Sequence, residues 1–252
     1  MKKIFVLTGE PSGDKLASEV ISQIKTKKAD LEFLSVGGTN LEKLGIKTIY
    51  DQKEITYIAF TDILLNFFKI KRKIKDTVNE VLKFNPDILF SVDSPDFTLR
   101  VAKLVKEKNP KIKIIHFIAP KVWAWREGRV KKMKEFLDHI LLLFRFEKEY
   151  FDKEKVTNTF VGHPLLDKKM YENIQIDQFL VKKKIISIFP GSRTSEINHH
   201  MPILIGFIKK MNSNDPNYNF IFHATDNNKE LILSYISKEQ IKNIEIINDD
   251  KI

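Results

Sequence analysis

Four loops of this sequence combine glycine, proline and charged side chains in ways that suit ligand binding. The first reads GEPSGD, from Gly9 to Asp14, and follows a short apolar run. Its glycines would let the backbone approach a ligand closely, and Ser12 or Asp14 could cap a following helix. The spacing is not G-x-G-x-x-G, so the loop lacks the dinucleotide-binding fingerprint. It is either a capped tight turn or a substrate-binding loop, with four candidate contacts: Glu10, Ser12, Gly13 and Asp14.

The second loop, SVDSPDF, carries the best candidate for acid–base chemistry. Asp93 follows an apolar run that is typical of a buried strand, and a carboxylate at such a strand end can remove a hydroxyl proton. Pro95 is expected to keep Ser94 extended and to end the strand. Asp96 is expected to cap a helix that starts at Phe97. Asp93 is then left for catalysis, the alternative being a hydrogen bond that orients the loop.

The third loop, APKVWAWR, contains both tryptophans of the chain with cations on either side. Two indole rings beside Lys121 suit an amphipathic ligand, because they offer apolar faces next to a phosphate-binding charge. Packing in the core is the alternative, and it would explain one tryptophan more easily than two. The candidate ligand contacts are Trp123, Trp125 and Arg126.

The fourth loop, FPGSRTSEI, joins an apolar run to a helical pattern. Backbone N–H groups at the start of a helix, together with an arginine, can bind a diphosphate. The G-x-x-x-x-G-K-[ST] spacing is absent, so P-loop chemistry is unsupported. A capped turn with a solvated arginine is the alternative. The candidate phosphate contacts are Gly191, Ser192, Arg193 and Glu196.

The segment from Ile55 to Lys75 has an apolar half followed by a cluster of cations. This pattern fits an element at a membrane surface, with its apolar side in acyl chains and its basic side at phosphates. It fits a core-packed helix equally well. The candidate membrane contacts are Tyr57, Ile58, Phe60, Ile63, Leu64, Phe67, Phe68, Lys69, Lys71 and Arg72.

These loops need a scaffold of alternating strands and helices. Strands are expected at 3–7, 32–36, 87–92, 113–118, 138–144, 159–161, 185–189 and 219–223, and helices at 14–26, 61–84 with a possible break, 97–108, 127–137, 147–152 and 198–211. The alternation predicts an α/β fold, a doubly wound parallel sheet, with the loops meeting at the carboxyl ends of the strands. A polar stretch at 166–183 is expected to link a domain at 1–165 to a partial second domain at 184–252.

Composition narrows the classes of function. The chain has 252 residues, no cysteine and a net charge of +10, so it should attract anions, although a biased genome would give the same charge. The absence of cysteine favours a reducing compartment, the cytoplasm. No apolar stretch approaches the length that crosses a bilayer. The sequence lacks the pattern of an element that reads nucleic acid, and it indicates no metal site. His163 could contact a ligand.

Five collinear motifs carry a family resemblance. In this chain they read GEPSGD, DSPDF, PKVWAWR, FVGHP and PGSRTSE, spread from Gly9 to Glu196. Together they resemble the hallmarks of the lipid-A-disaccharide synthase family, and the likeness covers essentially the whole chain. Each motif is weak alone, but the five in this order are specific.

The resemblance implies a GT-B glycosyltransferase without a cofactor, in which two Rossmann-like domains hold acceptor and donor. It implies transfer of 2,3-diacylglucosamine from UDP-2,3-diacylglucosamine to 2,3-diacylglucosamine 1-phosphate, with inversion and release of UDP, in lipid A biosynthesis. Asp93 matches the family's general base and Arg193 its diphosphate-binding arginine. The family's membrane-binding patch matches 55–75, so peripheral contact with the inner face of the cytoplasmic membrane is expected.

Members of the family continue well beyond Ile252, through the rest of the nucleotide site and through elements that can form a homodimer. The resemblance therefore implies a carboxyl-terminally truncated chain with weak turnover by itself. Two alternatives stay open. One is an impaired homologue that only binds membrane or lipid, and the other is a UDP-N-acetylglucosamine 2-epimerase-like enzyme on the same scaffold.

Overall fold

The computed structural model of the protein describes residues 1–28, 30–51, 54–55, 63–125, 128–164, 184–225, 228–239, 241 and 243–248, and for Asp51, residues 63–67, Trp125 and Asn248 it describes the backbone alone. The chain divides into two compact units, Met1–Lys168 and Lys169–Ile252. Each unit has its own parallel sheet and its own hydrophobic core.

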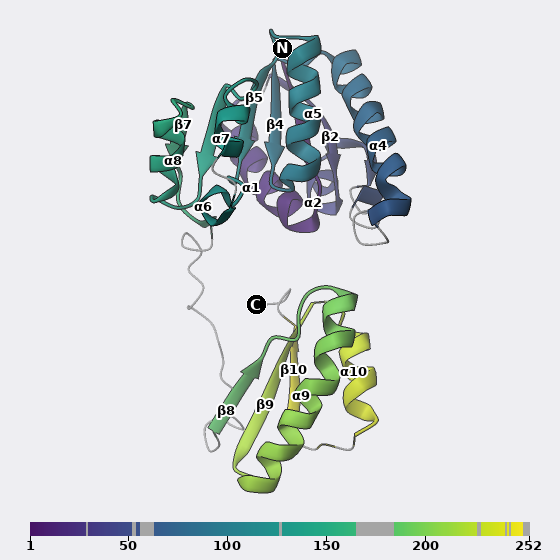
Figure 1. The fold of residues 1–252 in the computed structure, drawn as a ribbon. Coiled ribbons are helices and arrows are strands. Elements are labelled where there is room, and N and C mark those ends of the chain that lie inside the picture. Colours follow the sequence, from purple (N-terminus) through teal and green to yellow (C-terminus); the bar gives the residue numbers. More distant parts are fainter. Residues whose placement is uncertain are drawn as a thin grey trace. The chain divides into compact units, whose positions relative to one another are not determined.

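The first unit is built on a seven-stranded sheet in the order β3-β2-β1-β4-β5-β6-β7, in which every neighbouring pair is parallel (Figure 1). The strands are β1 Lys2–Thr8, β2 Leu31–Gly37, β3 Lys47–Asp51, β4 Ile88–Val92, β5 Lys113–Phe117, β6 His139–Leu142 and β7 Asn158–Phe160. Because β1 lies between β2 and β4, the direction of winding reverses beside it, as in Rossmann-like folds. The predicted fold class, a doubly wound parallel α/β sheet, is confirmed.

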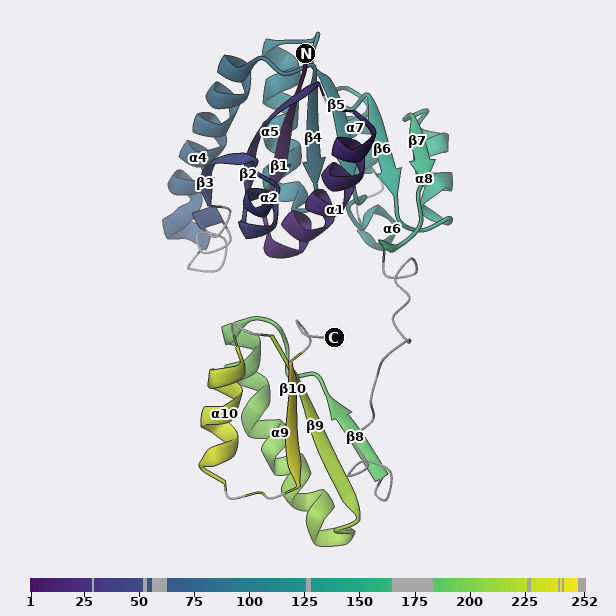
Figure 2. The same ribbon diagram turned by 180° about the vertical axis from the view of Figure 1, so that it is seen from behind.

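Helices cover both faces of this sheet (Figures 1 and 2). Alternate residues of β1 show why, since Phe5 and Leu7 belong to the core beneath α4 and α5, whereas Ile4 and Val6 belong to the core beneath α1 and α2. Strands buried on both faces read as continuous apolar runs. The helices are α1 Pro11–Lys27, α2 Thr39–Lys43, α4 Ile63–Phe84, α5 Pro95–Lys108, α6 Val122–Trp125, α7 Gly128–Met133 and α8 Glu147–Lys153.

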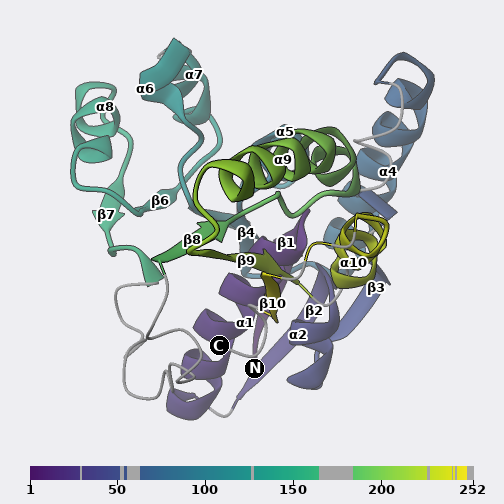
Figure 3. The same ribbon diagram turned by 90° about the horizontal axis from the view of Figure 1, so that it is seen from below.

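The second unit has a three-stranded parallel sheet in the order β10-β9-β8, with α9 and α10 on one face (Figure 3). Its elements are β8 Lys184–Ile188, α9 Thr194–Asn214, β9 Tyr218–Ala224, α10 Lys229–Ser237 and β10 Ile244–Asn248. Ile197, Met201 and Ile208 of α9 are buried against Phe220 and Phe222 of β9. The alternating order of strand and helix is the same as in the first unit.

The amino-terminal end of α1 is held by a contact that the sequence did not predict. Neither Ser12 nor Asp14 caps α1, whose N-cap residue is Glu10 and has no side-chain cap. Asp14 is instead buried. Its two carboxylate oxygens accept hydrogen bonds of 2.8 Å from the Gly38 N–H, 2.9 Å from the backbone and side-chain amides of Asn40, and 3.4 Å from the Leu41 N–H. Asp14 therefore joins α1 to the start of α2.

Replacing Asp14 by alanine should destabilise the first unit by about 3 kcal/mol, because it leaves buried N–H groups without an acceptor. The loss should appear as a lower midpoint in urea unfolding followed by circular dichroism. Ser12→Ala, two residues away and exposed, is the matched control and should change stability by less than about 0.5 kcal/mol. Equal stability of the two variants would contradict a structural role for Asp14.

Candidate active site

The loops after β1 and β4 meet where the winding of the sheet reverses. A Cβ atom at Gly9 would lie 2.6 Å from Cβ of Ser94, and a Cβ atom at Gly13 would lie 3.2 Å from the carbonyl oxygen of Val92. Larger residues would push the two loops apart. The glycines of the GEPSGD loop therefore allow it to pack against the loop that carries Asp93.

Three residues at this edge have left-handed backbones. Asp93 has φ of 51°, Ser94 of 46° and Ile118 of 77°, a region that residues other than glycine, asparagine and aspartate seldom adopt. The prediction that Pro95 keeps Ser94 extended is wrong, because tertiary contacts override the local preference. The Asp93 N–H donates to the Phe117 carbonyl at 3.0 Å, and Thr98 Oγ1 donates to the Asp93 carbonyl at 2.6 Å. Strain held by such contacts is typical of functional sites.

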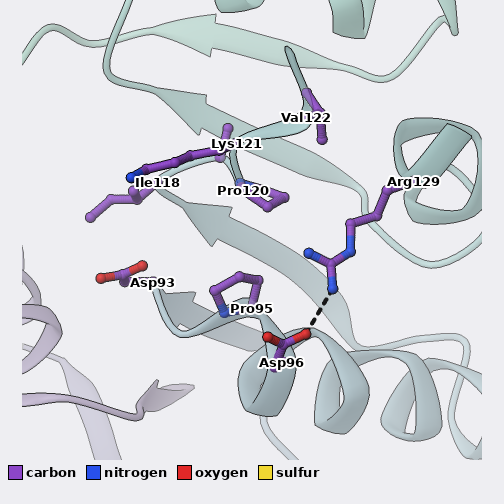
Figure 4. Close-up of a pocket in the computed structure, with 9 residues that line it drawn as sticks. Asp93, Pro95, Asp96, Ile118, Pro120, Lys121, Val122 and Arg129 are labelled. Carbon is purple, nitrogen blue, oxygen red and sulfur yellow. Dashed lines mark hydrogen bonds and ion pairs between the residues drawn. The ribbon is translucent and has the colours of Figure 1, made fainter. Parts of the chain in front are cut away.

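Asp93 and Ile118 line a cavity of about 620 Å³ at the carboxyl ends of β4 and β5 (Figure 4). The remaining lining residues are Pro95, Asp96, Ala119, Pro120, Lys121, Val122 and Arg129. In the part of the chain that the structure describes, no side chain hydrogen-bonds to the Asp93 carboxylate. The carboxylate is half-buried, and it is available to a ligand in the cavity.

Two cations line the same cavity. Lys121 is exposed, whereas Arg129 Nη2 pairs with Asp96 Oδ1 at 2.8 Å (Figure 4). The prediction that Asp96 caps the helix is wrong, because α5 begins at Pro95 and its N-cap residue is Ser94, without a side-chain cap. Asp96 instead holds Arg129 at the cavity. Arg129 was not among the contacts predicted from the sequence. Its position four residues after Trp125, in the same basic loop, was the available signal.

The other predicted contacts of the first unit fall in several places. Ser12 is exposed, Glu10 is partly exposed, and Gly13 is buried against β4. Asp14 points into the interior, so its oxygens are occupied and direct contact with substrate is not supported. The structure includes Trp123, in α6, and His163, after β7. Trp125 is described by its backbone alone, and Arg126 lies outside the described residues.

A buried histidine lies two residues before Ile118, which lines the cavity. His116 of β5 and Ser91 of β4 are fully buried, with Nδ1 of the histidine 2.8 Å from Oγ of the serine. Desolvation by burial lowers the pKa of His116 from 6.5 to about 4, although backbone contacts with Ile118 and Ser91 act in the opposite direction. The imidazole is therefore neutral in the folded protein at neutral pH.

This burial predicts a dependence of stability on pH. The folded pKa lies below the unfolded one, so the unfolded state binds a proton first, and stability is lost as pH falls from about 6.5 towards 4. At pH 5 this single group should lower the free energy of unfolding by about 2 kcal/mol relative to pH 7. Urea unfolding at the two pH values measures it. In His116→Gln the difference should shrink by this amount, and an unchanged difference would contradict the account.

The PGSR loop of the second unit begins α9. Gly191 has φ of 118°, and Arg193 is the N-cap residue of the helix. Glu196 Oε2 accepts from the N–H groups of Ser192 and Arg193 at 3.2 and 3.3 Å, while its Oε1 pairs with Arg193 Nη1 at 2.8 Å. The side-chain hydrogen bond from Arg193 is the main reason why the pKa of Glu196 is lowered. The negatively charged Glu196 carboxylate therefore occupies the hydrogen-bond donors of this loop. It would repel a phosphate group, so the predicted contact between Glu196 and phosphate is not supported.

The predicted membrane segment is described only in part. Tyr57, Ile58 and Phe60 lie outside the described residues, and Ile63, Leu64 and Phe67 belong to α4 through their backbone. Phe68, Lys69, Lys71 and Arg72 are exposed. None of the helices that the structure describes is long and apolar enough to cross a lipid bilayer. Within the same residues, no cluster of three His, Asp or Glu side chains could hold a metal ion.

Comparison with known proteins identifies relatives along almost the whole chain. Residues 4–251 match the family described as lipid-A-disaccharide synthetase. The chain is 36% identical to the lipid-A-disaccharide synthase of Rickettsia bellii over 84% of its length and 56% of the relative's. It is 31% identical to that of Coxiella burnetii, over 99% of its length and 66% of the relative's. The chain thus spans between about half and two thirds of the length of these curated relatives.

Solved structures extend the likeness of fold. The chain aligns over 98% of its length with Staphylococcus aureus MnaA in complex with UDP, with a TM-score of 0.64 and 16% identity. It aligns equally far with a UDP-GlcNAc 2-epimerase from Neisseria meningitidis bound to UDP-GlcNAc, with a TM-score of 0.61 and 15% identity. At such identities the likeness establishes the GT-B type of fold and nothing about the reaction.

Proposed function

This chain belongs to the lipid-A-disaccharide synthetase family, and we propose that it contributes the acceptor site and the first phosphate loop of a glycosyltransferase that joins two acylated glucosamines. The single observation that best supports this is the cavity at Asp93, where two cations lie together with a carboxylate that has no side-chain partner among the described residues. An acceptor that carries both a hydroxyl group and a phosphate matches that set of groups.

The reaction would proceed by displacement at the anomeric carbon of the donor. Asp93 takes the proton from the acceptor's 6-hydroxyl as its oxygen bonds to that carbon, and the bond from carbon to the diphosphate breaks. UDP leaves with the electron pair. Arg193 stabilises the negative charge that grows on the diphosphate, because arginine binds phosphate through two parallel hydrogen bonds. Lys121 and Arg129 attract the acceptor's phosphate to the cavity.

The test is a transfer assay with UDP-2,3-diacylglucosamine and 2,3-diacylglucosamine 1-phosphate, followed by mass spectrometry of the product and by release of UDP. We expect a disaccharide 1-phosphate and one UDP for each product formed. Release of UDP without disaccharide, or conversion of UDP-N-acetylglucosamine to its 2-epimer, would contradict the proposal.

A groove between α4 and α5 supports binding to a membrane surface. It has a volume of about 490 Å³, and Phe68, one of its lining residues, is 77% exposed. Its basic residues are Lys71, Arg72, Lys75 and Lys108, and its apolar residues are Phe68, Ile74, Val78 and Leu104. We therefore infer that this face of the first unit contacts anionic lipid.

Sedimentation with anionic phospholipid vesicles tests this inference. Each lost cation should cost about 1 kcal/mol, so Lys71→Gln with Arg72→Gln should weaken binding about thirty-fold in low salt. Phe207, an exposed phenylalanine of the second unit, provides a control, since Phe207→Ser should leave binding unchanged. Binding that is insensitive to the double substitution would exclude this face as the contact.

A further inference from the structure

Four aromatic rings form a continuous cluster at the same edge of the sheet as the cavity, here called the aromatic wall: Trp123, Phe144, Phe146 and His163. The rings of Trp123 and Phe146 meet edge to face at 4.9 Å between centroids. Phe146 stacks on Phe144 at 5.6 Å, and Phe144 lies 5.9 Å from His163. Neither Phe144 nor Phe146 was a candidate from sequence, because each lies in a run that reads as the end of a strand or the start of a helix.

The wall is assembled from three loops at one edge of the sheet. Trp123 follows β5, the two phenylalanines follow β6, and His163 follows β7. Since these strands are parallel to β4, their carboxyl ends lie at the same edge as Asp93. Phe144 is 41% exposed and Phe146 is 49% exposed. Two adjacent exposed phenylalanines on the ligand-binding edge indicate a contact surface for an apolar group.

The turn that carries the two phenylalanines is fixed. Glu147 is buried, and its Oε2 accepts a hydrogen bond of 2.9 Å from the Phe144 N–H. The Glu147 N–H in turn donates to the Phe144 carbonyl at 3.2 Å. Desolvation raises the pKa of the Glu147 carboxyl, against the effect of its backbone hydrogen bonds. A buried carboxylate is thus used to hold the turn, so Phe144 and Phe146 are presented outward on a fixed backbone.

The wall is connected to residues that line the cavity. Ile118, which lines the cavity, donates its N–H to the carbonyl of Leu141 at 3.1 Å, so the end of β6 lies directly beside it. Val122 lines the cavity as well, and Trp123 is the next residue. A ligand seated at Lys121 and Arg129 by an anionic group could therefore extend an apolar chain over the wall.

We propose that the aromatic wall binds an acyl chain of an acylated sugar phosphate whose sugar lies in the Asp93 cavity. This inference rests on the proposed function for the identity of the sugar, and it adds the site that recognises the chain. Long alkyl chains suit the wall because each buried methylene group contributes to binding, whereas the flat rings set no pattern of hydrogen bonds.

The chain's own fluorescence reports on this surface, since Trp123, one of its two tryptophans, belongs to the wall. The probe is glucosamine 1-phosphate acylated with brominated chains, in a six-carbon and a twelve-carbon form, used below its micelle-forming concentration. Bromine quenches indole on contact. We expect saturable quenching, with about ten-fold weaker binding of the long-chain probe after Phe144→Ala with Phe146→Ala. The short-chain probe should weaken less than about three-fold.

Matched variants test whether the acyl chain binds at the aromatic wall or elsewhere on the protein. Phe144→Leu with Phe146→Leu keeps the apolar area and should restore most of the affinity. Phe207→Ala removes an exposed phenylalanine of the second unit and should change nothing. If circular dichroism shows that the alanine pair unfolds, Phe146→Asn alone gives the same comparison at the more exposed ring.

The inference would be overturned by a lack of quenching in the wild-type protein, by equal weakening of both probes in the alanine pair, or by weakening in Phe207→Ala as large as that in the pair. The same experiments distinguish failure of the acyl site from failure of the proposed transfer reaction. Chain-length-dependent binding without disaccharide formation would refute the transfer reaction and keep the acyl site. Transfer with an acceptor KM that the alanine pair leaves unchanged would keep the reaction and refute the acyl site.

Discussion

Replacing Asp93 by asparagine is expected to lower kcat for disaccharide formation by about a thousand-fold, because the acceptor hydroxyl loses its general base. Asparagine is the informative substitution here. Asp93 has a left-handed backbone, which asparagine tolerates and alanine does not. Asparagine also keeps the size of the side chain, so the acceptor's KM should change little. Steady-state transfer rates at several acceptor concentrations measure both quantities.

The neighbouring carboxylate supplies the control. Asp96→Asn removes the partner of Arg129 at the same cavity, yet it should lower activity only a few-fold, because partly exposed ion pairs contribute little. If Asp93→Asn kept a tenth or more of the wild-type rate, Asp93 would not be the base. If Asp96→Asn were the more damaging substitution, the two carboxylates would have to exchange roles.

Much of the scaffold could be predicted from the sequence because its central strands are buried on both faces. The runs that form β1, β4, β5 and β9 are mostly apolar, as is typical of such strands. The edge strand β3, which reads KTIYD, was missed because three of its five residues are polar. Helix α10 was missed as well, and α4 runs unbroken from Ile63 to Phe84. Short elements and edge strands have only a weak pattern of apolar residues, and their secondary structure is determined by packing against the rest of the fold.

The residues of the candidate site could be predicted where their place after a strand was enough to locate them in the fold. Asp93 and Arg193 each follow an apolar strand, and the fold brings such residues to the carboxyl edge of a sheet. The roles of Asp14 and Glu196 depended on partners that no local pattern reveals. Asp14 binds Gly38 and Asn40, which are more than twenty residues away. Glu196 looked like part of an anion site, although it is itself the anion.

The Glu196 carboxylate leads to the second large effect, at the diphosphate loop. Arg193→Ala should weaken UDP binding, measured by calorimetry, by about thirty-fold, because it removes a charge-assisted pair of hydrogen bonds. Arg193→Lys should recover only part of the loss, since lysine keeps the charge without the planar fork. Affinity that Arg193→Ala leaves unchanged would refute a diphosphate site at this loop.

Substitution of Glu196 should have the opposite effect on UDP affinity to substitution of Arg193. It accepts from the N–H groups of Ser192 and Arg193 and also pairs with the Arg193 side chain, so a diphosphate must displace it from those donors. Glu196→Gln keeps an acceptor for the start of α9 but removes the competing charge. UDP should then bind a few-fold more tightly, most clearly at low ionic strength, where repulsion between anions is least screened. Weaker binding in Glu196→Gln would mean that the ionised carboxylate instead orients Arg193 for the phosphate.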